Sequence, residues 1–69
     1  MSTSLNTFAN AWIARYRELD AMRKKVETRI AEADNERKRN VWRRFLTRIN
    51  TDLDDHVAAW KAIKPLLEA

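Results

Sequence analysis

The sequence contains no glycine and no cysteine, and its single proline, Pro65, lies near the end. Strand-rich folds of this size need tight turns, so the scarcity of turn-forming residues argues against a β-sheet protein. The missing cysteines exclude disulfides and leave any metal site without thiolates. The lone histidine, His56, would need several converging carboxylates to bind zinc. Alanine, leucine, arginine, lysine and glutamate, all good helix formers, fill the chain, so the sequence predicts an all-α fold.

At 69 residues the chain is one small domain, and a core of this size rarely stabilises itself. Because disulfides are excluded and no metal site is evident, oligomerisation is the remaining source of stability. No apolar run approaches the roughly 20 residues that span a bilayer, and the first residues do not resemble a signal peptide. We therefore expect a cytoplasmic protein without a cofactor.

Two amphipathic segments of similar length are separated by seven consecutive polar residues, at positions 34–40. The pattern predicts a helix over about residues 4–33, a turn at about 34–36 and a helix over about 36–64. Asn35 is expected to adopt the left-handed conformation at the turn, and Asp34 or Asn35 to cap the second helix. Pro65 should end or kink that helix, leaving a short tail with Leu66 and Leu67 over the open end. The alternative is one unbroken helix through the polar segment.

The apolar side chains recur at spacings of three and four residues and form one stripe on each predicted helix. Antiparallel pairing of the two helices places Phe8 near Trp60 and Trp12 near Val57. The stripes exceed what two helices can cover, so we expect a symmetric homodimer of hairpins, a four-helix bundle. The residues assigned to the core or dimer interface are Phe8, Trp12, Tyr16, Leu19, Met22, Val26, Phe45, Leu46, Ile49, Leu53, Val57, Trp60 and Ile63.

The net charge of +4 is unevenly distributed along the chain. Basic residues predominate from Arg15 to Arg48, whereas acidic residues predominate after Ile49, so the two parts suit different partners. Candidate partner-binding residues are the basic and aromatic Arg37, Arg39, Trp42, Arg43, Arg44 and Arg48, and the acidic Asp52, Asp54 and Asp55. The aspartates are interpreted as a docking patch because nothing on a hairpin would bury them for acid–base or metal chemistry.

No catalytic arrangement is evident, so the protein is not expected to be an enzyme. The basic cluster could instead be a solvated face or a phosphate-binding strip. A small nucleic-acid-binding protein and a structural coiled-coil adaptor are therefore the alternative functions. We expect any nucleic-acid binding to be weak. Membrane binding is not expected, since the two apolar stripes can pack on each other.

The spacing of Phe8, Trp12 and Tyr16, the charged turn, and the segment Val41-Trp42-x2-Phe45-Leu46 resemble a family of small, two-helix phage proteins, the quorum-sensing anti-activators. The resemblance covers the whole chain in size and overall pattern. It implies a dimeric hairpin that acts in the host bacterial cytoplasm. It also implies binding to the DNA-binding domain of a LuxR-type transcription regulator, and inhibition of the type IV pilus assembly ATPase.

Overall fold

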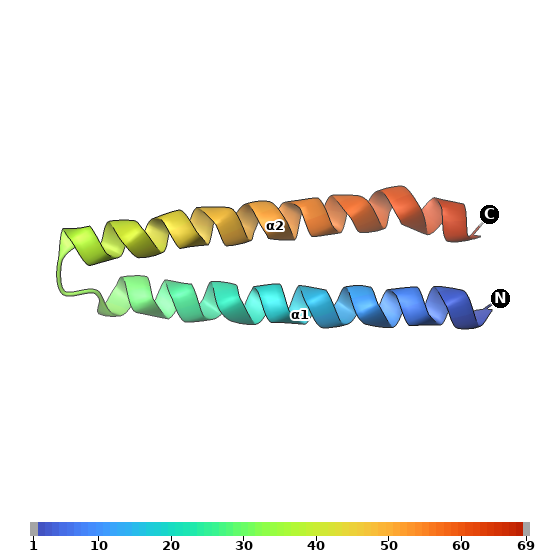
Figure 1. Ribbon diagram of the computed structural model, residues 1–69, viewed down its shortest axis with the longest axis horizontal. Coiled ribbons are helices and arrows are strands. Elements are labelled where there is room, and N and C mark those ends of the chain that lie inside the picture. The colour runs from blue at the N-terminus through green and yellow to red at the C-terminus, as the bar shows by residue number, and fades with distance from the viewer. Residues whose placement is uncertain (1, 69) are drawn as a thin grey trace.

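The computed structural model describes residues 2–68, with the side chains of residues 5–68. Helix α1 (Ser2–Glu32) and helix α2 (Glu36–Glu68) run antiparallel, with the loop at one end and both termini at the other (Figure 1). The described chain contains no strand and extends over 53 × 17 × 10 Å. The all-α helical hairpin is confirmed, and one unbroken helix is excluded. The helix α1 begins two residues earlier than predicted.

The turn over residues 33–35 is fixed by local hydrogen bonds. The backbone N–H of Lys38 donates to the side-chain oxygen of Asn35 at 2.8 Å, which confirms Asn35 as the cap of α2. At the end of α1, the Arg39 guanidinium donates to the carbonyl of Ala33 at 3.1 Å. The expected left-handed conformation of Asn35 is wrong, because no residue between 2 and 68 has a positive φ. Instead, the backbone N–H of Ala33 donates to the carbonyl of Ile30 at 3.3 Å, which closes the end of α1 without a left-handed residue.

The predicted end of the second helix at residue 64 is also wrong. The helix α2 continues through Pro65 to Glu68, and Lys64 pairs with Glu68 at 3.8 Å. Pro65 has no backbone N–H to donate, and its ring crowds the carbonyl of Lys61, four residues earlier. Only one turn follows Pro65, so few helical bonds depend on it. Leu66 remains 76% exposed and does not cover the open end.

The core is a narrow seam between the two helices. Only Leu19, Val26 and Ile49 are buried within the described single chain. Most other members of the predicted core are half-buried, namely Phe8, Trp12, Leu46, Leu53, Val57, Trp60 and Ile63. Tyr16, Met22 and Phe45, which were assigned to the core or dimer interface, are exposed in the single hairpin. Two cylinders touch along one line, so side chains at the margins of each stripe lie outside the contact.

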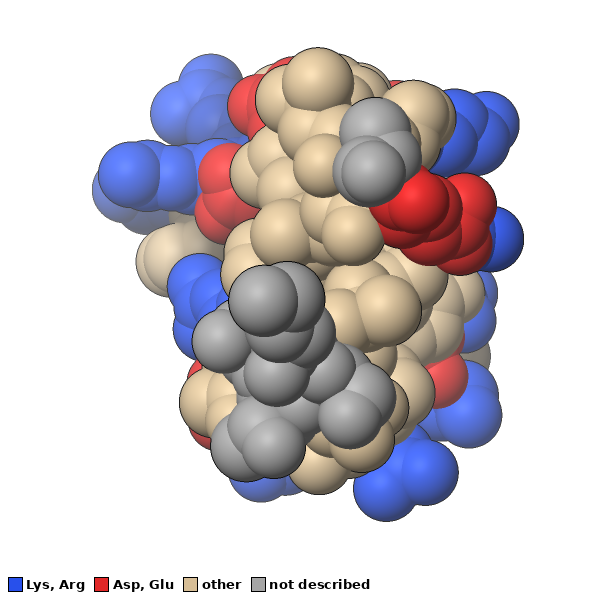
Figure 2. All heavy atoms as spheres, turned by 90° about the vertical axis from the view of Figure 1, so that its right-hand side faces the viewer, with Lys and Arg blue, Asp and Glu red and all other residues tan. Residues whose placement is uncertain are grey.

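Stacked rings fill the seam at the open end, the half that carries both termini. Phe8 stacks on Trp60 with ring centroids 5.8 Å apart, as the predicted pairing requires. The Trp12 ring centroid lies 5.1 Å from that of Trp60 and 4.7 Å from that of His56, so Trp12 stacks on the residue that precedes Val57. The end view in Figure 2 shows uncharged residues through the middle of the molecule, with Lys and Arg projecting on both sides.

Candidate interaction surfaces

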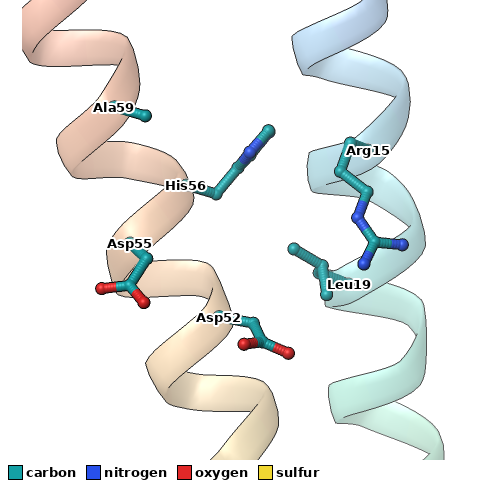
Figure 3. Close-up of a pocket in the computed structure, with 6 residues that line it drawn as sticks. All are labelled: Arg15, Leu19, Asp52, Asp55, His56 and Ala59. Atoms are coloured by element: carbon teal, nitrogen blue, oxygen red, sulfur yellow. The ribbon is translucent and has the colours of Figure 1, made fainter.

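A shallow, solvent-open hollow lies across the two helices near the middle of the hairpin. Figure 3 shows Arg15 and Leu19 contributed by α1, and Asp52, Asp55, His56 and Ala59 contributed by α2. We call it the acidic hollow, after its two aspartates. The structure therefore brings together two of the three predicted acidic residues. Asp54 is not among the lining residues, because it lies about 200° around the helix from Asp52.

Among the described residues, the aspartates of the acidic hollow have no ion-pair partner, unlike most of the acidic side chains. Arg23 donates to Asp20 at 2.6 Å, and with Lys24 it holds the pKa of that carboxyl below its usual value. The same Asp20 carboxylate raises the pKa of Arg23. Lys38, at 3.1 Å, likewise lowers the pKa of Asp34. Within the described residues, the acidic side chains that form no ion pair are Glu32, Asp52, Asp54 and Asp55.

The predicted basic strip divides into two groups. Arg39 and Arg43 both pair with Glu36, at 2.7 and 3.0 Å, and so stabilise the start of α2. Arg39 is further tied to the loop through the carbonyl of Ala33. By contrast, the exposed side chains of Arg37, Arg44 and Arg48 take part in none of the described ion pairs. These three guanidinium groups are therefore free to meet a partner.

Exposed apolar side chains lie between these arginines. Val41 is 47% exposed and Phe45 is 52% exposed, and both line an open hollow with Arg44 and Arg48. The next hollow toward the loop is lined by Asn35, Arg37, Lys38, Val41 and Trp42. Trp42, the aromatic member of the candidate partner-binding residues, is half-buried, and its ring centroid lies 5.7 Å from that of Phe45. The more exposed of these two aromatic side chains is therefore Phe45, which the sequence analysis assigned to the core or dimer interface.

The helix α1 contributes to the same surface. On α1, Arg15, Met22 and Arg29 follow one another at intervals of seven residues. On α2, Phe45 and Asp52 are also seven residues apart. Seven residues are close to two full turns, so each series lies along one side of its helix. Because Arg15 and Asp52 line the acidic hollow together, Met22 and Phe45 share its face, two turns nearer the loop. Met22 is 48% exposed. We call this surface the loop-half face; it consists of Met22, Val41 and Phe45 with Lys25, Arg29, Arg37, Arg44 and Arg48.

A second apolar surface lies on another side of the hairpin. Ile13 and Tyr16 are 40% and 38% exposed, and the Tyr16 ring stacks on Trp12 at 5.4 Å. On α1 these residues lie about 160° and 100° from Arg15, so they point away from the acidic hollow. Leu53 and Val57 on α2 are half-buried and do not line that hollow. We call these four residues the Tyr16 strip.

His56 has a structural role that sequence reasoning missed. Its Nε2 donates to the backbone carbonyl of Trp12 at 2.9 Å, while the Trp12 indole donates to the carbonyl of His56 at 2.9 Å. The acceptor of the histidine bond is a carbonyl, so Nε2 must carry the proton. The register that pairs Phe8 with Trp60 also pairs positions 12 and 56. This register could have predicted the contact between Trp12 and His56 from the sequence.

Comparison with known proteins assigns no family: no family model, no curated protein and no solved structure matches the chain. Residues 2–68 contain no group of three or more His, Asp or Glu side chains that could hold a metal ion. No helix in that range is long and apolar enough to cross a membrane. Inference about function therefore depends on the acidic hollow, the loop-half face and the Tyr16 strip.

Proposed function

We propose that this protein is a non-enzymatic, homodimeric inhibitor that binds a basic protein surface through Asp52 and Asp55. One observation carries the proposal: both aspartates line the same open surface, one helical turn apart, and form no ion pair within the described residues, whereas most acidic residues there are paired. An unpaired, exposed carboxylate loses little on binding and attracts cationic partners over several ångströms.

A DNA-binding domain suits such a surface. It presents arginine and lysine side chains to the phosphates of DNA, and carboxylates that occupy the same groups exclude the DNA. Leu19 and Ala59 give the acidic hollow an apolar floor against which the stem of a bound arginine or lysine can pack. The resemblance to phage anti-activators supports a host LuxR-type regulator as this partner, and the type IV pilus assembly ATPase as a second one.

The homodimer follows from the thinness of the core. Among residues 5–68, a single hairpin buries three side chains, too few to stabilise a domain of this size. The Tyr16 strip is the surface best suited to a second copy, because it is apolar. The loop-half face is less suited, because a two-fold axis would bring its unpaired arginines close to their own copies. Each dimer then presents two acidic hollows, which raises avidity where both can engage.

Charge reversal tests the acidic hollow. The variant Asp52→Lys with Asp55→Lys should slow association with the DNA-binding domain of a LuxR-type regulator by about tenfold or more. The matched control, Glu32→Lys with Asp54→Lys, makes the same charge change at unpaired acidic residues outside the hollow and should retain association. Surface plasmon resonance over a salt series measures the rates, and circular dichroism checks the fold. Wild-type association by the first variant would reject the acidic hollow as the contact.

Sedimentation equilibrium tests the dimer. The wild-type chain of 8.2 kDa should sediment at twice its mass at micromolar concentration. Tyr16→Glu should give a monomer, because it places a charge in an apolar interface. Phe45→Glu, on the loop-half face, should leave the dimer intact. A wild-type monomer whose melting temperature does not depend on concentration contradicts the proposal.

A further inference from the structure

The loop-half face combines an apolar centre with a basic rim. Met22, Val41 and Phe45 are each about half exposed, although each belongs to an apolar stripe. The rim consists of Lys25, Arg29, Arg37, Arg44 and Arg48, and none of these takes part in an ion pair within the described residues. Exposed apolar groups and uncompensated charge both favour a partner over solvent.

The positive charge ends abruptly along the helix. Arg48 and Asp52 are four residues apart on α2, a spacing that permits contact, yet they form no ion pair. Between Arg48 and the loop, this side of the hairpin carries unpaired cations. Between Asp52 and the open end, it carries the acidic hollow. The two surfaces are therefore adjacent but of opposite charge, and a partner of one should be repelled by the other.

We propose that the loop-half face binds an acidic amphipathic helix of a second protein partner. A helix with an apolar stripe flanked by glutamate or aspartate matches this face in both respects. Its apolar side chains would cover Met22, Val41 and Phe45, and its carboxylates would pair with the surrounding arginines. Nucleic acid matches only the rim, because a phosphate backbone offers nothing apolar to cover Val41 and Phe45. This inference goes beyond the proposed function and does not depend on Asp52 or Asp55.

A synthetic probe provides the test with the full-length protein. The probe is a fluorescein-labelled helical peptide with leucines at i, i+3 and i+7 and glutamates on both sides of that stripe. Its control has glutamine in place of every glutamate. Anisotropy titrations at two salt concentrations should show binding of the acidic peptide that weakens as salt increases, and little binding of the glutamine peptide.

Two pairs of variants locate the contact. Arg44→Ala with Arg48→Ala should weaken peptide binding by about tenfold or more, whereas Arg17→Ala with Lys61→Ala, an equal charge loss at other unpaired cations, should not. Phe45→Ala should weaken binding similarly, whereas Leu66→Ala, at the 76% exposed leucine near the C-terminal end, should not. All these side chains are exposed, so the fold should be retained, and circular dichroism verifies this.

The same titration compares the other possible occupants. Duplex DNA, or vesicles of phosphatidylglycerol and phosphatidylcholine, should bind more weakly than the acidic peptide and should not depend on Phe45. Stronger, Phe45-dependent binding of either would overturn the proposal in favour of that ligand. Dissociation of the dimer by Phe45→Ala would assign this face to a second copy instead. Equal affinity for the acidic and glutamine peptides would remove the basis for an acidic partner.

Discussion

Stacked rings join the two helices at the open end, whereas the chain itself joins them at the loop. Trp12 contacts Trp60 and His56 across the seam, and two hydrogen bonds link the helices at the same level. Near the loop, Phe45 is 52% exposed, and the described ion pairs there are local. Free helix ends fray unless side chains hold them, while a short loop already keeps its two helices together.

This difference explains why the side chains of the loop-half face remain exposed. Near the loop, the chain connection holds the helices together, so apolar and charged side chains there need not pack between the helices. Phe45 and Arg48 on the loop-half face are examples. At the open end, Phe8, Trp12 and Trp60 are needed to hold the hairpin together. We therefore expect substitutions among the stacked rings of the open end to reduce stability, and substitutions on the loop-half face to reduce binding at that face.

The largest expected effect is on Trp12. Trp12→Ala removes ring contacts with Tyr16, His56 and Trp60 and one cross-helix hydrogen bond, so it should destabilise the fold by about 3 kcal/mol. Phe45→Ala should cost about 1 kcal/mol or less, because its ring is half exposed. Urea denaturation followed by circular dichroism, at one fixed protein concentration, measures both. Equal losses of stability would contradict the division between the two halves.

A smaller effect is expected at His56. His56→Ala removes the Nε2 hydrogen bond to the Trp12 carbonyl and the ring stacked on Trp12, at a cost of about 1–2 kcal/mol. The neighbouring Asp55→Ala serves as the control and should change stability by roughly 0.5 kcal/mol or less, since Asp55 is exposed and unpaired. The same urea titrations apply. A His56→Ala variant as stable as the control would show that the rings alone hold the open end.

The smallest expected effect concerns acid. Arg23 and Lys24 lower the pKa of Asp20 below its ordinary 3.8, so the ionised carboxylate favours the folded state. Its contribution is present above that value and is lost as the pH falls through the lower pKa of the folded protein. Thermal melts from neutral pH to about pH 2 should show this loss, and Asp20→Asn should reduce it. Asp54→Asn removes a carboxylate that forms no ion pair and should reduce it less. An equal reduction by both would contradict a specific role for the Asp20 cluster.

The sequence by itself determined the helical hairpin. The absence of glycine, the spacing of apolar residues and the polar interval at 34–40 specified two helices and a turn, and Asn35 caps the second as expected. The pairing of Phe8 with Trp60 also follows from matching two rods of similar length. These features depend on local chemistry and periodicity, so a sequence pattern is enough to predict them.

Only the tertiary structure decided which charges and which rings remain available. The sequence treated Arg39, Arg43, Arg44 and Arg48 as one cluster, but the fold pairs the first two with Glu36 and leaves the others unpaired. It assigned Phe45 to the core or dimer interface, and in the single hairpin this ring is half exposed because two helices cover less than the full width of each stripe. The pairs with Glu36 lie within α2, but which of several neighbouring arginines takes that carboxylate depends on side-chain conformation, and the exposure of Phe45 depends on where the two helices meet. Apolar periodicity alone specifies neither.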